Sequence, residues 1–163
     1  MEIQSEPKVV TAMLIRRPIE EVFEAFVDPE ITSKFWFTKG SARLAAGEKV
    51  RWDWEMYGKS GDVSVDACEP GRRICVQMGP TGQPSTTAEW TFDRRGEDQT
   101  FVTITNSGFE GAGDDVVGQA LGSTQGFSLV LAGAKAYLEH GLQLNLVEDR
   151  YPDTLVEGWQ GRR

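Results

Sequence analysis

The stretch GSTQGFSLVLAGAKAYLEHG, residues 122–141, decides the fold of this chain. Its apolar residues recur at the spacing of one helical face, which predicts a long helix. The same stretch contains Gly122, Gly126 and Gly133, although a glycine inside a helix costs about 0.5–1 kcal/mol relative to alanine. Small residues let a helix approach a second layer closely in some places and leave volume in others. Periodicity alone supports two interpretations equally: tight packing without a cavity, and packing around a pocket.

Strand and helix signals precede this long helix in a clear order. Residues 8–15, KVVTAMLI, form an apolar and β-rich run that predicts a first strand. Pro18 suits the first turn of a helix that covers IEEVFEAFV, residues 19–27. Asp28-Pro29 then predicts a break and the start of a second short helix.

From about residue 41 to residue 107 the apolar period changes to two. In VRWDWEMY, residues 50–57, large apolar residues alternate with charged ones, so Asp53 and Glu55 are expected on a solvated face. The segments DVSVDAC, RICVQM, TAEWTFD and TFVTITN follow, separated by short turns. Such short connections predict an antiparallel meander of six to seven strands. Asp114 or Asp115 is expected to cap the long C-terminal helix, and the whole order of elements predicts an α+β fold.

The 163 residues are expected to form a single domain, because the chain shows neither an internal repeat nor a low-complexity linker. The predicted core covers about residues 8–145, and a partly irregular C-terminal tail covers about residues 146–163. Leu155, Val156 and Trp159 in the tail are expected to pack either on the domain or on a second copy of the chain. Both a monomer and a homodimer therefore fit the sequence.

The net charge of −8 argues against nucleic acid as a partner, because binding phosphates needs a basic face. Adsorption to anionic membranes is disfavoured for the same reason. No apolar run approaches the roughly 20 residues that cross a bilayer, so we expect no membrane insertion. The N-terminal MEIQSEPKVV lacks the basic and apolar regions of a signal peptide. A cytoplasmic location is therefore expected.

Cysteine and histidine offer little reactive chemistry in this chain. Cys68 and Cys75 flank the turn EPGRRI, and a hairpin there could bring them opposite each other. Two reduced thiols are expected in the cytoplasm, and a disulfide is the alternative. His140 lies near the end of the long helix, where a cation suits the helix dipole. We predict no metal site, no cofactor and no catalytic residue, because the ligand sets, nucleotide-binding loops and nucleophile motifs are missing.

Several segments resemble a known family. They are FEAFVDPE followed by FWF, the strand TFVTITNSGF, and GSTQGFSLVLAGAKAYLEHGLQLNLVEDRYP. They are similar to the heat-shock-protein-90 ATPase activator-homologue family, over roughly residues 8–152. That family belongs to the START-like, birch-pollen-allergen-like superfamily (SRPBCC), also called the polyketide cyclase and lipid-transport superfamily. The resemblance implies a helix-grip fold, in which a curved antiparallel sheet holds a long C-terminal helix around a hydrophobic cavity. This chain departs from the family at Phe35-Trp36-Phe37, where relatives often have two adjacent tryptophans.

Strand alternation and helical periodicity select the side chains that are expected to face such a cavity. Large aromatic rings and adaptable methionines suit an apolar or aromatic small molecule, and ordinary core packing is the alternative explanation for each of them. The candidate ligand-binding residues are Trp36, Trp52, Trp54, Met56, Met78, Trp90, Phe92, Gln125, Phe127, Val130 and Leu131.

Three functions follow from this reading. The favoured one is binding of an apolar small-molecule ligand in the cavity between the sheet and the long helix. The second is a cyclase, dehydratase or hydrolase that uses the same cavity, which would need a titratable group with a shifted pKa inside it. The third is a stress protein that interacts with a chaperone, which the family name implies. Binding is favoured over catalysis because alternation directs the strand carboxylates away from the interior.

Overall fold

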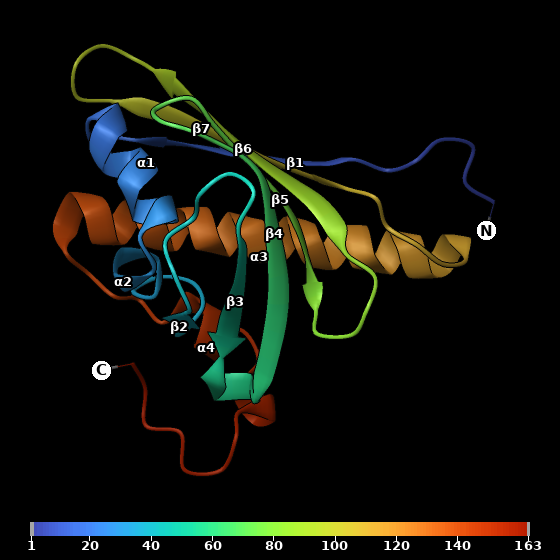
Figure 1. Cartoon of the computed structure of the whole chain (residues 1–163). Coiled ribbons are helices and arrows are strands. Elements are labelled where there is room, and N and C mark those ends of the chain that lie inside the picture. Colours follow the sequence, from blue (N-terminus) through green and yellow to red (C-terminus); the bar gives the residue numbers. More distant parts are fainter. Residues whose placement is uncertain (1, 163) are drawn as a thin grey trace.

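Seven antiparallel strands curve around a long helix in the computed structural model, which describes residues 2–162 (Figure 1). The sheet order is β1-β7-β6-β5-β4-β3-β2, so the strands after β1 form a meander and β1 joins its far edge beside β7. The strands are β1 Val9–Ile15, β2 Lys39–Gly40, β3 Lys49–Trp54, β4 Lys59–Glu69, β5 Arg73–Pro80, β6 Thr86–Arg94 and β7 Thr100–Ser107. The predicted helix-grip arrangement of the α+β class is confirmed.

The helices lie where proline and helical periodicity predict them. They are α1 Ile19–Val27, α2 Pro29–Thr32, α3 Gly113–His140 and α4 Leu146–Asp149, with short 3-10 helices η1 Glu55–Tyr57 and η2 Pro152–Thr154. Asp28 ends α1 and caps α2, since its Oδ1 accepts a hydrogen bond from the backbone N–H of Glu30 at 3.0 Å. The two short helices after the first strand are therefore both confirmed.

Two local expectations are wrong. The residue at the N-cap of α3 is Ala112, which provides no side-chain hydrogen bond, while Asp114 and Asp115 lie inside the first turn. Acidic side chains there still interact favourably with the positive end of the helix dipole. The alternation of VRWDWEMY also stops at Trp54, because η1 follows and ends at Gly58 with a φ of 60°. Met56 is fully buried, but from this turn rather than from a strand.

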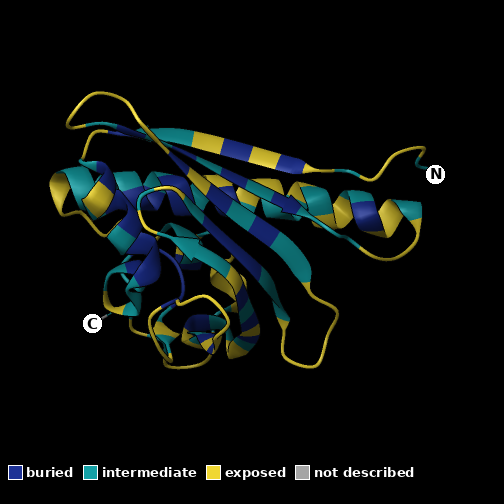
Figure 2. Cartoon of the chain, turned by 45° about the horizontal axis from the view of Figure 1, so that its top comes forward, coloured by how far each residue is buried: buried dark blue, intermediate teal, exposed yellow. Residues whose placement is uncertain are grey.

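The core lies between the inner face of the sheet, α1 and α3 (Figure 2). On β7 every second residue from Thr100 to Asn106 is buried, as a sheet with one covered face requires. Phe127, Val130, Leu131 and Ala134 form the buried side of α3. An aromatic cluster continues this core toward β3, where the ring of Phe37 stacks on Trp52 with centroids 4.9 Å apart. The sheet therefore buries one face against the long helix.

Cys68 and Cys75 do not lie opposite each other in the hairpin, although the sequence allows that pairing. A bulge between Val65 and Ala67 shifts the register of β4 against β5, so Cys68 lies opposite Ile74 and Cys75 lies opposite Ala67. Neighbouring positions of a strand project to opposite faces of the sheet. Both cysteines are free, and burial raises the pKa of each thiol. This register separates the two thiols, so they are not placed to form a disulfide.

The glycines of α3 fall into two groups. A Cβ built on Gly133 would lie 3.2 Å from the Cβ of Phe35, and one built on Gly126 would lie 3.1 Å from Nη1 of Arg150. Around Gly118 and Gly122, in contrast, no such atom lies within 4 Å. Of these four glycines, Gly133 and Gly126 are therefore the ones that another segment approaches closely.

The C-terminal tail folds back onto the domain through a buried ion pair. Arg162 Nη2 lies 2.7 Å from Glu148 Oε1, and their side chains are only 5% and 3% exposed. Arg162 also donates hydrogen bonds to the carbonyl oxygens of Ser33, Trp36 and Phe37. The backbone N–H of Val156 donates to the carbonyl of Met56 at 2.8 Å. The tail thus packs on its own domain and connects α4 with the FWF segment.

Close packing at Gly133 can be tested by placing the same side chain at two glycines of one helix. We expect Gly133→Val to lower the free energy of unfolding by about 1–3 kcal/mol, because the added atoms overlap Phe35. Gly118→Val is the matched control and should change that free energy by no more than about 0.5 kcal/mol. Urea unfolding followed by tryptophan fluorescence measures both. Equal losses at the two positions would contradict a close approach at Gly133.

The buried ion pair of the tail makes a second prediction. Arg162→Met leaves the Glu148 carboxylate buried without its cation, so the free energy of unfolding should fall by about 3 kcal/mol. Adding Glu148→Met should recover part of this loss, because an apolar pair no longer buries an unpaired charge. Chemical denaturation of the single and double variants measures this coupling. A single variant as stable as the original protein would show that the pair does not hold the tail.

Candidate ligand-binding site

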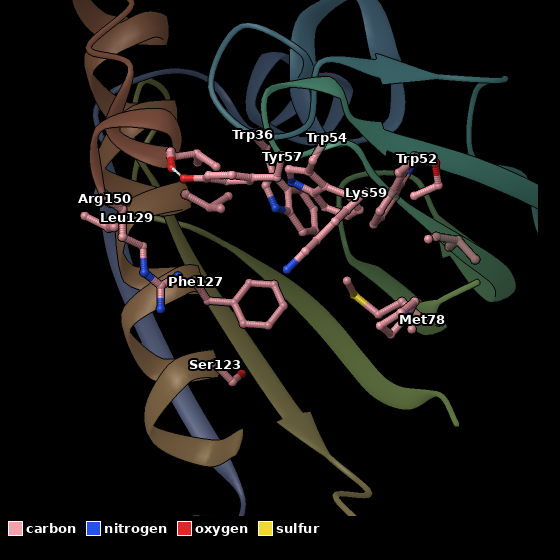
Figure 3. Close-up of a pocket in the computed structure, with 18 of the residues that line it drawn as sticks. Trp36, Trp52, Trp54, Tyr57, Lys59, Met78, Ser123, Phe127, Leu129 and Arg150 are labelled. Atoms are coloured by element: carbon pink, nitrogen blue, oxygen red, sulfur yellow. Dashed lines mark hydrogen bonds between the residues drawn. The ribbon is translucent and has the colours of Figure 1, made fainter. Parts of the chain in front are cut away.

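A pocket of about 770 Å³ lies between strands β3 to β5, the middle of α3, and α4 with the residues that follow it (Figure 3). Its wall is mainly aromatic and apolar. Trp36, Trp52 and Trp54 come from the FWF segment and β3, Met78 comes from β5, and Phe127 comes from α3. Sheet and helix are therefore separated at this place by a space that could hold a small molecule.

The ring of Trp36 contacts aromatic rings of both β3 and α3. Its ring centroid lies 4.8 Å from that of Trp52, 6.1 Å from Trp54 and 5.8 Å from Phe127. Trp52 and Trp54 lie two positions apart on β3 and so project to the same face of the sheet. Edge-to-face and tilted contacts at these distances are favourable for aromatic rings. The wall is thus a connected aromatic cluster rather than a set of separate side chains.

The structure brings some of the predicted ligand-binding residues to the pocket and leaves others elsewhere. Those that line it are Trp36, Trp52, Trp54, Met78, Phe127 and Val130. Those outside the lining are Met56, Trp90, Phe92, Leu131 and Gln125.

The residues outside the lining have identifiable reasons for their positions. Phe92 packs beneath α1, with its ring 5.1 Å from Phe23, and Leu131 and Met56 are buried in the core. Gln125 is exposed, since it lies two positions before Phe127 and a helix turns by about 200° over that interval. Trp90 lies behind the wall, with its ring 6.0 Å from Phe127. Its buried indole N–H has no hydrogen-bond partner in residues 2–162.

Sequence reasoning missed the polar part of the lining. The missed residues with polar side chains are Tyr57, Lys59, Ser60, Thr81, Ser123, Arg150 and Tyr151. Ser123 could have been found, because it lies four positions before Phe127 on the same helical face. The others belong to η1, to strand ends and to the tail. Apolar periodicity carries no signal for such segments.

Hydrogen bonds hold several of these polar groups in place. Ser123 Oγ donates to Oδ1 of Asn106 at 2.7 Å. Tyr57 Oη donates to the carbonyl oxygen of Val147, and burial, together with the nearby Glu148 carboxylate, raises the pKa of Tyr57. This phenol is therefore neutral near pH 7 and acts as a hydrogen-bond donor.

Acid–base and metal chemistry have few candidate groups at this site. Within residues 2–162, the pocket lining includes neither a carboxylate nor a histidine. The same described part of the chain holds no group of three or more His, Cys, Asp and Glu side chains arranged to bind a metal ion. Among these residues there is also no helix that is long and apolar enough to cross a membrane.

Solved structures with this arrangement come from several sources. A Staphylococcus saprophyticus protein, SSP2350, is 30% identical with a TM-score of 0.72, over 85% of this chain and 96% of that one. DynU16, from the dynemicin biosynthetic locus, is 25% identical with a TM-score of 0.70, and the match spans 85% of this chain but about half (49%) of DynU16. The Aha1 dimer from Colwellia psychrerythraea is 20% identical with a TM-score of 0.69, over 83% of this chain and 98% of that one. This last likeness supports the fold alone.

A curated protein also shares a short stretch with this chain. Paired box protein Pax-4 of Rattus norvegicus is 37% identical over 57 residues, which are 35% of this chain and 16% of that protein. The chain thus spans about a sixth of the length of this relative, too little to transfer a function.

A match to a family model over most of the chain establishes the family. Residues 16–139 match the family described as "Activator of Hsp90 ATPase homolog 1-like protein". The matched region extends from the end of β1 to the last turn of α3, and so includes most of the sheet and the long helix. This chain therefore belongs to the activator of Hsp90 ATPase homolog 1-like family, as the FWF segment and the long helix predict.

Proposed function

We propose that this protein binds an apolar or aromatic small molecule in the pocket between the sheet and α3. The observation that carries the proposal is the aromatic wall of Trp36, Trp54 and Phe127 around a volume of about 770 Å³. Ligand sites in proteins typically enclose about 300–1,000 Å³ and are lined mainly by apolar and aromatic side chains. Both the size and the lining of the pocket therefore support a small molecule.

The chemistry of the wall also favours an aromatic or otherwise flat ligand. Trp54 is only partly buried although it belongs to the aromatic cluster, so part of its surface is free for contact. An aromatic contact contributes about 0.5–1.5 kcal/mol beyond the area that it buries. Met78 faces the same space and can adapt its shape to different ligands.

Catalysis of the cyclase, dehydratase or hydrolase kind is the second candidate. Its support is the likeness to DynU16, a protein of the dynemicin biosynthetic locus. A reaction in this pocket would need Tyr57, Lys59 or Tyr151 as the acid or base, because the described lining has no carboxylate or histidine. Tyr57 is occupied as a donor to Val147. Binding therefore remains the better-supported function.

We also propose two protein partners, a chaperone and a second copy of this chain. The family description names an activator of the Hsp90 ATPase, which supports contact with a chaperone. The Colwellia psychrerythraea protein is described as a dimer, and we propose a homodimer here as well. We propose a cytoplasmic location, which agrees with both a chaperone partner and a homodimer.

The proposal can be tested with a neutral fluorescent probe and two tryptophan substitutions on one helix. N-phenyl-1-naphthylamine should bind the protein saturably and become brighter in the apolar pocket. Leu129 lines the pocket, whereas Leu121 is 67% exposed on the same helix. Leu129→Trp should fill part of the volume and weaken binding at least about tenfold, since roughly 1.4 kcal/mol of contact is enough for that factor. Leu121→Trp is the control and should leave the dissociation constant within about twofold.

A fluorescence titration of the three proteins measures these constants, and urea unfolding checks that both variants are folded. Equal affinity in all three would place the probe outside the pocket. A folded protein that does not bind the probe at all would contradict the proposed function.

A further inference from the structure

The charge of the pocket is opposite to that of the chain. The whole chain has a net charge of −8 at pH 7. Within residues 2–162, the charged side chains that line the pocket are Lys59 and Arg150, and no aspartate or glutamate is among the lining residues. A pocket with two cations and no lining carboxylate in an acidic protein favours negatively charged ligands over neutral ones.

Lys59 is held at the rim of the pocket by the turn before it. It is the first residue of β4, directly after Gly58 in the left-handed conformation, and it lies opposite Trp54 in the ladder. Figure 3 shows its ammonium group directed toward the space beside Phe127 and Met78. No hydrogen bond or ion pair joins this group to the rest of residues 2–162. Its three N–H donors are thus free for a ligand.

Arg150 approaches from the opposite wall, beside α3 (Figure 3). Its Nη2 donates to the carbonyl of Gly122 at 3.2 Å, and its guanidinium lies over the ring of Tyr151, 4.7 Å from the centroid. Gly126 leaves the room that Nη1 occupies, since a Cβ there would lie 3.1 Å from it.

The guanidinium of Arg150 has unused donors. It carries five N–H groups, but Gly122 is its one hydrogen-bond acceptor in residues 2–162, and its buried Nε has none. Arg162 differs, because it pairs with Glu148. In the described structure no carboxylate forms an ion pair with Arg150.

From these observations we infer that the ligand is an amphipathic anion. It has an apolar or aromatic body and one carboxylate or similar anionic group, whose charge Lys59 and Arg150 neutralise. The inference rests on the proposed function, because the apolar body occupies the same aromatic wall. An anion that enters an apolar pocket loses hydration, and charge-assisted hydrogen bonds to cations offset that loss. A ligand without acceptor atoms would leave the donors of Arg150 unpaired, and a neutral acceptor forms a weaker hydrogen bond with a cation than an anion does.

Two dyes that differ by one sulfonate group separate the contribution of charge to the affinity from that of apolar contact. 8-Anilinonaphthalene-1-sulfonate carries the same ring system as N-phenyl-1-naphthylamine, with one added negative charge. The sulfonate should bind the original protein more tightly than the neutral dye. Lys59→Met and Arg150→Met should each raise the dissociation constant of the sulfonate by roughly tenfold, which corresponds to the loss of a hydrogen bond to a charged group. The affinity for the neutral dye should fall by clearly less than the affinity for the sulfonate in both variants.

The controls distinguish the pocket from the general surface charge. Lys49→Met removes an exposed lysine of β3 outside the pocket lining and should leave both constants unchanged. Decanoate should displace the neutral dye at lower concentration than decanol, which extends the result from a sulfonate to a carboxylate. Urea unfolding of each variant shows that it is folded.

Each outcome has a defined meaning. Equal affinity for the two dyes, or an equal loss of affinity for both in the Lys59 and Arg150 variants, would contradict the proposal of an anionic ligand. Either result would still agree with binding of an apolar ligand in the pocket. If the original protein does not bind the neutral dye, the proposed function fails, and the inference that rests on it fails as well.

Discussion

The close approach of α3 to Phe35 at Gly133 is the contact on which the rest of the site depends. A side chain at this position would lie against the Cβ of Phe35, so glycine allows the helix to hold the FWF segment. That segment places Trp36 between β3 and α3, in ring contact with Trp52 and Phe127. About two turns earlier on the helix, the same inward face meets the pocket. Gly133 and Gly126 therefore allow close contacts, at a cost in helix propensity of about 0.5–1 kcal/mol each relative to alanine.

A second constraint completes the pocket from the C-terminal side. Arg162 binds Glu148 and the carbonyl groups of the FWF segment. Since Glu148 belongs to α4, this ion pair fixes Val147 and Arg150 at the pocket wall. A buried ion pair adds little net stability relative to an apolar pair, but it specifies one arrangement because breaking it is costly. The tail thus acts as a structural part of the site.

The sequence predicts those features that depend on one covered face. Alternation identified the strands and the tryptophans of β3, and helical periodicity identified Phe127 and Val130. Prediction from these patterns failed where a local conformation differs from a regular strand. Met56 enters the core from a 3-10 turn, and the bulge in β4 separates Cys68 from Cys75. Lys59 and Arg150 were missed because their positions depend on the turn at Gly58 and on tertiary contacts of the tail. Neither produces a periodic signal in the chain.

The indole N–H resonances of the tryptophans report directly whether a ligand enters between the sheet and α3. Trp36, Trp52 and Trp54 line the pocket, whereas Trp159 lies in the tail outside it. In ¹H–¹⁵N spectra, saturating N-phenyl-1-naphthylamine should shift the indole signals of the three pocket tryptophans and leave that of Trp159 unchanged. Substitution of each tryptophan by phenylalanine assigns the signals. A shift at Trp159 with none at the three pocket residues would show that the ligand binds outside the space between the sheet and α3.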